Sequence, residues 1–277
     1  MITETDISLA DGRTLHVYDT GPADADVTVY WHAGTPQVGL PPLAAVDRTD
    51  IRWIAHDRPG YGGSTVRPGR TIADVATDAA AVLDELGVAR CAVLGSSGGG
   101  PNALACAALL PERVIGVACL ASLAPFDAEG LDWFAGFAPS GLRELRAATQ
   151  GADALRAHLA AAGDGPPDWL NDKDVDMFSG RLGPWLIRSS TEGMAKGVDG
   201  FVDDDVAAVS PWGCDPTGID VPMLLLHGDN DRGVPFAHGQ WLADHCPTAE
   251  LRRFPGDSHI SVLAHIDQAV DRLAELR

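Results

Sequence analysis

Short apolar runs alternate with helix-like segments along most of this chain, and this alternation restricts its fold more than any other feature. Three of the runs, at 91–94, 114–120 and 221–226, are apolar almost throughout. Such runs are typical of strands that are covered on both faces of a parallel sheet. A helix-like segment at 71–86, with Thr71 as its expected N-cap, precedes the first of them. This order predicts an α/β fold with a mostly parallel central sheet flanked by helices. Further strands are expected at 28–31, 51–55 and 250–254, and further helices at 101–110 and 262–276.

The beginning and the middle of the chain depart from this alternation. An Asp11-Gly12 turn between two short alternating runs predicts an antiparallel hairpin at the start. Between 126 and 212 no strand-like run occurs, although leucines recur there at helical spacing. We therefore expect a core formed by residues 1–125 and 213–277, with residues 126–212 inserted as a helical cap.

The charge of the chain disfavours several classes of partner. Its 277 residues include 39 acidic and 20 basic side chains, which gives a formal net charge of −19. This charge repels nucleic acid and anionic membrane surfaces. Hydrophobic residues make up 45% of the chain, too many for a disordered polymer, and no apolar run approaches the roughly 20 residues of a membrane span. We therefore expect a globular protein with a small-molecule substrate and with no nucleic-acid or membrane partner.

The cysteines and the first residues bear on the compartment. Five cysteines are an odd number, and their wide spacing fits no metal motif. We expect them to be small buried thiols in a reducing compartment. The first 17 residues lack the basic and apolar regions of a signal peptide. Together these features predict a cytoplasmic protein. The cysteines lie at positions 91, 106, 119, 214 and 246.

The segment Gly95-Ser96-Ser97-Gly98-Gly99 matches the pattern G-x-S-x-G. By itself the pattern is weak, because a chain rich in glycine can contain it by chance. Its setting is more informative, since it directly follows one expected strand and directly precedes one expected helix. A nucleophile elbow requires that setting, with glycines where the tight turn leaves no room for a side chain. Ser97 is therefore the candidate nucleophile, and a plain glycine-rich turn or a phosphate-binding loop is disfavoured.

A serine hydroxyl needs a base and a group that orients the base. Among nine histidines, His259 lies between the last strand and the last helix, at the carboxyl edge of the sheet where open α/β folds bind ligands. Asp229 and Asp231 follow one buried strand, and Asp127 follows another. All three are candidates for the orienting acid on these grounds. The order Ser97, Asp231, His259 is the chain order used with such elbows.

Four motifs together resemble the α/β-hydrolase superfamily, and the resemblance covers nearly the whole chain outside the cap. It implies an α/β-hydrolase fold with a helical cap after the sixth strand, which matches residues 126–212. It also implies that the acid is the aspartate three residues after Gly228, which selects Asp231 over Asp229. The motifs are His32-Ala-Gly-Thr-Pro36, Asp57-Arg-Pro-Gly-Tyr-Gly-Gly-Ser64, Gly95–Gly99, and Gly228-x-x-Asp231-x-x-Val234-Pro235 with His259 near the end.

The same resemblance implies an oxyanion hole made from the backbone N–H groups of Gly98 and Thr35. One position departs from the family pattern, because Ala33 stands where a histidine is usual and the histidine is displaced to His32. A backbone donor does not depend on that side chain. We expect the run at 57–64 to be structural, with its proline and glycines forming the turn after the fourth strand.

These residues predict a serine hydrolase that uses neither a metal nor an organic cofactor. Ser97 would attack a carbonyl, His259 would transfer the proton and Asp231 would orient the imidazole. The expected substrate is an ester, or a related acyl compound, of small to medium apolar character. Alternatives are the hydrolysis of amides, N-terminal peptides or carbon–carbon bonds, perhydrolysis, and a lyase reaction. A non-catalytic ligand-binding role is disfavoured by the intact triad, and a serine at 97 argues against dehalogenase and epoxide hydrolase chemistry.

Aromatic side chains in the cap are expected to reach the substrate. Trp133, Phe134 and Phe137 lie close together in the sequence of the predicted cap. Because substrate pockets are walled mainly by apolar and aromatic groups, we expect these three residues to form part of an apolar pocket. The cap would then have to move to admit substrate. The sequence does not indicate an oligomeric state.

Overall fold

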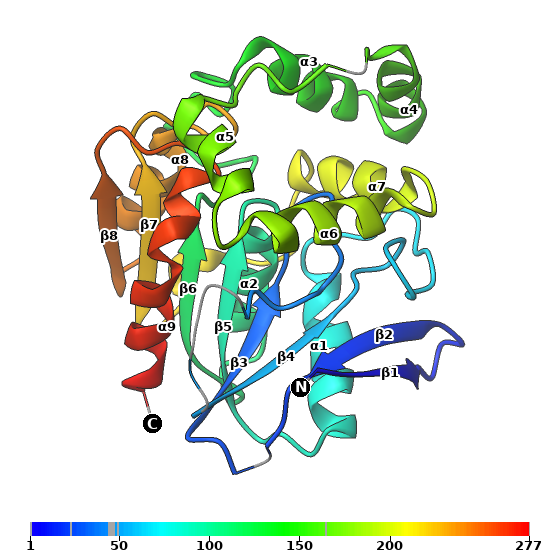
Figure 1. Cartoon of the computed structure of the whole chain (residues 1–277), viewed down its shortest axis with the longest axis vertical. Coiled ribbons are helices and arrows are strands. Elements are labelled where there is room, and N and C mark those ends of the chain that lie inside the picture. Colours follow the sequence, from blue (N-terminus) through cyan, green and yellow to red (C-terminus); the bar gives the residue numbers. More distant parts are fainter. Residues whose placement is uncertain (1, 23, 44–47, 49, 164, 277) are drawn as a thin grey trace.

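A mixed sheet runs through the centre of the molecule (Figure 1). The computed structural model describes every residue except 1, 23, 44–47, 49, 164 and 277. Within those residues the sheet has eight strands in the order β1-β2-β4-β3-β5-β6-β7-β8. The strands are β1 (Thr3–Ser8), β2 (Thr14–Asp19), β3 (Val27–His32), β4 (Ile51–His56), β5 (Cys91–Ser96), β6 (Val114–Leu120), β7 (Met223–Gly228) and β8 (Ala249–Phe254).

The directions of the strands confirm the predicted sheet. Strand β2 is antiparallel to both of its neighbours, β1 and β4. The other neighbouring pairs are parallel. The hairpin predicted at Asp11-Gly12 joins β1 to β2, with Ser8 paired to Thr14 beside the turn. The carboxyl ends of β3 to β8 therefore lie along one edge of the sheet.

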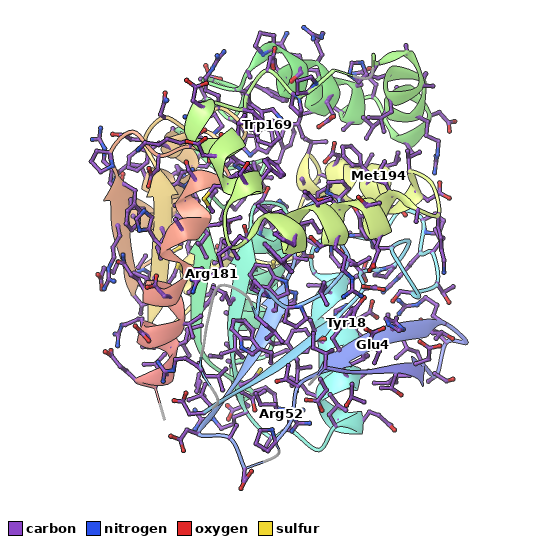
Figure 2. All side chains as sticks on the ribbon, viewed as in Figure 1. Glu4, Tyr18, Arg52, Trp169, Arg181 and Met194 are labelled. Atoms are coloured by element: carbon purple, nitrogen blue, oxygen red, sulfur yellow. The ribbon has the colours of Figure 1, made fainter. Side chains whose placement is uncertain are left out.

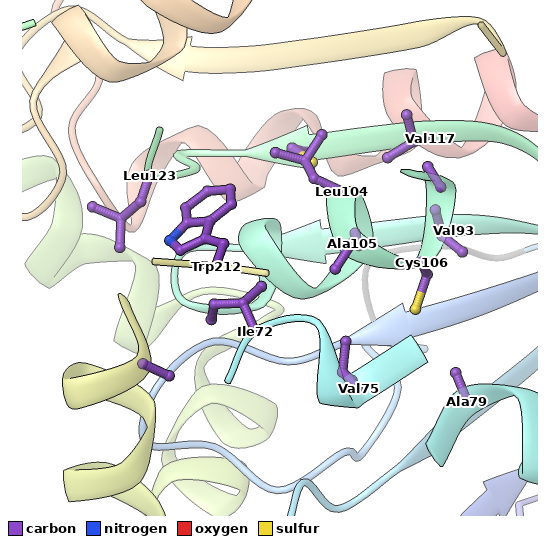
Figure 3. Close-up of a cluster of buried hydrophobic side chains, with 14 of the residues drawn as sticks. Ile72, Val75, Ala79, Val93, Leu104, Ala105, Cys106, Val117, Leu123 and Trp212 are labelled. Carbon is purple, nitrogen blue, oxygen red and sulfur yellow. The ribbon is translucent and has the colours of Figure 1, made fainter. Parts of the chain in front are cut away.

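Side chains of the central strands alternate between two apolar cores, one on each face of the sheet. Val93 lies in the core that α1 and α2 cover, whereas its neighbour Leu94 lies in the core that α9 covers. Because both faces are covered, β5 shows no polar alternation in its sequence. Figure 3 shows the first core, with Val75 of α1 and Cys106 of α2 near Val93. The covering helices are α1 (Asp74–Glu85), α2 (Gly99–Leu109), α8 (Phe236–His245) and α9 (Ile266–Ala274).

The first helix begins three residues later than the sequence predicts, and Thr71 is not its N-cap. Regular helix starts at Asp74, and the side chain of Asp74 accepts hydrogen bonds from the backbone nitrogen and hydroxyl of Thr71, at 2.7 and 3.0 Å. The chain does begin to turn at Thr71, whose carbonyl accepts from the amide of Asp74. The prediction of Thr71 as N-cap is wrong because the hydrogen bonds run the other way. The carboxylate of Asp74, in the first turn of the helix, accepts from Thr71, and the Thr71 hydroxyl does not accept from the described residues of the helix.

Five helices, called the cap helices below, lie between β6 and β7 in the described part of the chain. No strand interrupts them among the described residues, as the sequence predicts. Figure 1 shows them beyond the carboxyl ends of the parallel strands, with α3 and α4 farthest from the sheet. The boundaries of the cap at 126 and 212 stay predictions. The cap helices are α3 (Pro139–Ala148), α4 (Ala152–Ala161), α5 (Asp172–Ser179), α6 (Gly183–Met194) and α7 (Asp199–Ala208).

Two short 3₁₀ helices complete the described part of the chain, η1 (Pro216–Gly218) and η2 (Ser261–His265). All five cysteines are free thiols, and all but Cys214 are buried. Among the described residues, no helix combines the length and apolarity needed to span a bilayer.

Candidate active site

Ser97 occupies a sharp turn between β5 and α2. Its φ of +52° lies in the left-handed region, which a residue with a side chain adopts only under strain. The flanking glycines make the turn sterically possible. A Cβ atom on Gly95 would lie 2.4 Å from the carbonyl oxygen of Gly99, and one on Gly99 would lie 2.1 Å from that of His32. The turn therefore presents the Ser97 hydroxyl at the carboxyl end of the sheet.

Ser97, His259 and Asp231 form a continuous chain of hydrogen bonds. The Nε2 atom of His259 lies 2.8 Å from Ser97 Oγ, and its Nδ1 atom lies 2.9 Å from Asp231 Oδ2. The three side chains come from segments that follow β5, β7 and β8, so the parallel sheet brings together residues up to 162 positions apart. In this arrangement Nδ1 donates to the carboxylate, which leaves Nε2 free to accept the serine proton.

The surroundings of Asp231 keep it ionised. Its Oδ1 atom accepts hydrogen bonds of 2.8 Å from the amides of Gly233 and Val234. Burial opposes its ionisation, but the neighbouring imidazoles of His259 and His227 outweigh it and hold the pKa of Asp231 well below its ordinary value. Burial likewise opposes protonation of His259, but the charge of Asp231 outweighs it and raises the pKa of the imidazole. The pair thus favours a charged imidazolium next to the carboxylate.

The other two candidate acids lie elsewhere. Asp229 accepts from the side chain of Arg253, at 2.7 and 3.0 Å, and from the backbone amide of Gly256 at 2.7 Å. It therefore fixes the turn after β8 and does not contact the imidazole. Asp127 is exposed in the turn that follows β6. Of the three, Asp231 alone is hydrogen-bonded to His259.

The amides expected in the oxyanion hole lie side by side near Ser97. A Cβ atom on Gly98 would be 3.3 Å from the backbone nitrogen of Thr35 and 2.4 Å from its hydroxyl oxygen. Among the described residues, neither amide donates a hydrogen bond to another group. Ala33 and the displaced His32 are both buried, and burial lowers the pKa of His32 well below its ordinary value. His32 is therefore a neutral side chain beneath the loop.

A buried aspartate on the cap, Asp204 of α7, fixes this loop. Its Oδ2 atom accepts from the Thr35 hydroxyl at 2.6 Å, from the Arg58 guanidinium at 2.5 Å and from the Tyr61 hydroxyl at 2.8 Å. Arg70 donates to its other oxygen. Burial opposes ionisation of Asp204, but Arg58 and Arg70 outweigh it and hold its pKa far below the ordinary value. No sequence motif indicated this contact between the cap and the loop after β3.

The run at 57–64 is largely structural, as expected. Asp57 accepts from the amides of Gly39 and Gly63, at 2.7 and 2.9 Å, and so closes the turn after β4. Arg58 does more than form the turn. In addition to its contact with Asp204, its guanidinium donates to the carbonyl oxygen of Ala33. The motif therefore also supports the loop that carries Thr35.

A second cap residue, Asp174 of α5, supports the segment that carries His259. Its Oδ1 atom accepts from the amides of Ile260 and Ser261, at 3.0 and 2.8 Å. Its Oδ2 atom completes a capping box with Asn171 at the start of α5. One buried carboxylate thus begins a cap helix and fixes the backbone next to the base. The sequence signal for it is the pair Asn171 and Asp174 at the spacing of a capping box.

Two cavities meet at Ser97 and His259, which line both. The acidic cavity, of about 320 Å³, reaches Glu144 and Asp205 on the cap helices. The apolar cavity, of about 220 Å³, shares Trp169 with the acidic one. Trp169, at the centre of the cap in Figure 2, contacts the His259 ring edge-on at 5.2 Å between centroids. The apolar cavity is lined by Leu170, Phe178, Leu186, Ile260 and Leu263, among others.

Of the three aromatic residues predicted to wall the substrate pocket, one lies at a cavity beside Ser97. Phe137 lines the acidic cavity, whereas the other two line neither cavity. Trp133 is fixed behind Phe137, because its indole N–H donates to the carbonyl of Ala124 at 3.0 Å and its ring stacks on that of Phe137. The ring of Phe134 lies against the guanidinium of Arg146 instead. Trp169, which no sequence motif indicated, lies edge-on against the His259 ring instead.

Two acidic side chains in the first cavity were also missed. Burial raises the pKa of Glu144 to about 7. Burial, and then the charge of Glu144, raises the pKa of Asp205 well above its ordinary value. Both residues lie in helices rich in charged side chains, where the sequence pattern indicates a solvated face.

Comparison with known proteins identifies the family to which this fold belongs. A family model described as alpha/beta hydrolase fold matches residues 28–265. A non-heme haloperoxidase from Rhodococcus erythropolis is 32% identical over 222 residues, 75% of each chain. A bifunctional esterase/perhydrolase from Acinetobacter calcoaceticus is 29% identical over 272 residues, 91% of this chain and 92% of the relative. An enol-lactonase structure from Burkholderia xenovorans LB400 superposes with a TM-score of 0.71 at 22% identity, over 98% of this chain and 99% of that one. The chain therefore belongs to the alpha/beta hydrolase fold family.

Proposed function

We propose that the protein is a serine hydrolase that cleaves an ester, or a related acyl bond, of a small molecule through an acyl-enzyme. His259 Nε2 accepts the proton of Ser97 as Oγ bonds to the substrate carbonyl carbon. The carbonyl oxygen becomes an oxyanion that the amides of Gly98 and Thr35 face. Each such donor is worth about 3 kcal/mol of barrier in comparable sites. The imidazolium then protonates the leaving group as the tetrahedral intermediate collapses.

The second half of the reaction reverses these roles. His259 removes a proton from water, the resulting hydroxide bonds to the acyl carbon, and the bond to Ser97 Oγ breaks as the serine regains its proton. Asp231 keeps the imidazole in the tautomer that both halves need. Residues 126–212 serve as a cap that limits access of water and substrate. The protein's own residues supply every proton transfer in this scheme.

The observation that carries this proposal is the unbroken hydrogen-bond chain from Asp231 through His259 to Ser97, at 2.9 and 2.8 Å. A fluorophosphonate should modify the protein once, at Ser97, and Ser97→Ala should abolish both labelling and turnover of p-nitrophenyl esters. Peptide mapping by mass spectrometry locates the modified residue. Labelling that persists in the alanine variant, or its absence from the unchanged protein, contradicts the proposal.

Perhydrolysis is a second candidate, because one of the relatives is an esterase/perhydrolase similar over 91% of this chain. In that reaction hydrogen peroxide replaces water in the second half, so the acyl group leaves as a peracid. Mixing the protein with p-nitrophenyl acetate and hydrogen peroxide should then produce peracetic acid that depends on Ser97. Hydrolysis without peracid would exclude this candidate and leave the first intact.

A further inference from the structure

Besides Asp204, which is paired with Arg58 and Arg70, the acidic cavity is lined by two carboxyl groups that the proposed mechanism does not use. Glu144 of α3 and Asp205 of α7 line the same cavity as Ser97 and the amides of the oxyanion hole. No lysine or arginine is among the described residues that line it. The other walls are mostly apolar and include Ile72, Leu123, Phe137, Leu145, Trp169 and Val234.

Asp205 is a buried carboxyl group without a complete set of partners. The residue is only 8% exposed, and its Oδ2 atom has no hydrogen-bond partner among the described residues. Its chain neighbour Asp204 is equally buried but is paired with Arg58 and Arg70. Because a buried polar group without a hydrogen bond is destabilising in an apolar setting, a donor that enters from the cavity would satisfy Asp205.

The chemistry of that group follows from the two carboxyls and the walls. A protonated amine donates up to three hydrogen bonds, and its positive charge complements a pair of carboxylates. Aromatic rings such as Phe137 and Trp169 also favour a neighbouring cation. A bound carboxylate or phosphate would instead face two carboxyl groups, with no lysine or arginine among the described lining residues to offset their charge.

We infer that Glu144 and Asp205 bind a protonated amine of the substrate, so that the enzyme acts on esters or amides whose acyl group carries an ammonium group. This inference rests on the proposed serine hydrolase function and names its substrate class. The raised pKa values of the two carboxyls agree with it, because a bound cation would restore their charge. The apolar cavity would then receive the leaving group.

The first test compares matched substrates. p-Nitrophenyl esters of ω-amino acids from 3-aminopropanoate to 6-aminohexanoate are compared with their isosteric alkanoates, butanoate to heptanoate. For at least one length, kcat/KM of the amino ester should exceed that of its isostere by about 10-fold or more, the range expected for charge-assisted hydrogen bonds. Glu144→Gln and Asp205→Asn should each reduce this ratio towards one.

Asp203→Asn is the matched control, since Asp203 is a buried aspartate of the same helix that does not line the cavity. The ratio of amino ester to isostere should stay unchanged in this variant. Equal losses in all three variants would mean a general disturbance of the cap helices and would overturn the assignment. Preference for the neutral isosteres at every length would overturn it as well.

The second test does not require catalysis or an altered carboxyl. Calorimetric titration of Ser97→Ala with n-butylammonium and n-hexylammonium chloride, each against the corresponding n-alkanol, measures recognition of the cation alone. Tighter binding of the ammonium supports the inference even if the chain proves not to hydrolyse esters. Equal or weaker binding, together with normal hydrolysis of alkanoates, overturns the inference and leaves the proposed function standing.

Discussion

Three consecutive aspartates in α7 show how strongly the immediate environment decides what one residue type does. Asp204 is surrounded by donors and stays ionised, with its pKa held far below the ordinary value by Arg58 and Arg70 despite burial. Asp205 faces Glu144, and burial together with that neighbour raises its pKa. Asp203 accepts from the amide of Gly69. Asp204 therefore fixes the loop of Thr35, Asp205 lines the acidic cavity, and Asp203 closes the turn at Gly69.

The assignment of the orienting acid can be tested by single substitutions. Asp231→Asn should leave the fold intact but lower kcat by about 10⁴-fold, because the amide favours the wrong tautomer of His259. Asp229→Asn should cost far less, since Asp229 contacts Arg253 and Gly256 and not the imidazole. Steady-state kinetics on one ester decides the matter. A larger loss in the Asp229 variant would mean that the assignment is wrong.

The acid limb of the pH profile should report the charge of Asp231. Only the neutral imidazole of His259 accepts the serine proton, so kcat/KM falls as the pH drops through the pKa of His259. Because Asp231 raises that pKa, the fall should begin at a higher pH than for an ordinary histidine, whose pKa is about 6.5. In Asp231→Asn the midpoint should move to lower pH. An unchanged midpoint in that variant would contradict the electrostatic role.

Local sequence predicted the central residues of the site but not those around them. Ser97, Asp231 and His259 each lie in a short motif whose glycines or prolines mark the turn at the end of a strand. Asp174 and Asp204 act across distances of 86 and 146 residues along the chain. In a chain with 39 acidic residues, composition does not separate a buried carboxylate from a solvated one.

At the scale of elements, Asp174 of α5 joins the cap to the backbone beside His259 of the proposed triad. Asp174→Ala removes both the capping box with Asn171 and the acceptor for the amides of Ile260 and Ser261. Loss of a helix cap typically costs about 1 kcal/mol. We therefore expect a lower Tm together with a lower kcat, because the segment next to His259 loses its support.

The matched control is Asp172→Ala, which alters an exposed aspartate in the first turn of the same helix. It should change Tm only slightly and leave kcat within about twofold, since surface changes outside such contacts are small. Thermal unfolding and ester kinetics on both variants separate the two roles. If Asp174→Ala lowers Tm and leaves kcat unchanged, the hydrogen bonds from Ile260 and Ser261 to Asp174 do not affect turnover.

The elements themselves were more predictable than the directions of their side chains. The strands could be predicted because burial on both faces of a sheet requires a run of consecutive apolar residues. In the segment before α3, all of the aromatic residues are apolar, so the pattern could not distinguish Phe137, which lines the cavity, from Trp133 behind it. A hydrogen bond from the Trp133 indole to Ala124 makes that distinction, and it forms only in the folded chain.

At the scale of the whole molecule, the buried carboxyl groups should make stability depend on pH. The pKa of Glu144 is raised by burial to about 7, so folding favours its protonated form. That contribution is fully present below the unfolded pKa, which is about 4.3, and is lost as the pH rises through 7. The Tm of the unliganded protein should therefore fall between pH 5 and pH 8, and it should fall less in Glu144→Gln.

Comparing the unchanged protein with Glu144→Gln removes the general effect of net charge on stability, because the net charge becomes more negative with rising pH in both. Differential scanning calorimetry at matched ionic strength measures the two curves. Parallel curves would show that Glu144 ionises as readily in the folded state as in the unfolded one.

The bond between Asp204 and the loop of Thr35 has a consequence for how a substrate enters. It ties α7 to the carboxyl edge of the sheet, and the amide of Val38 ties α6 there as well, through the carbonyl of Ser189 at 3.1 Å. If these two helices moved away, the oxyanion hole would lose its support. We therefore expect substrate to enter past residues 166–170, which include the exposed 166–168 and the Pro167 and Trp169 that line both cavities, while α6 and α7 stay in place.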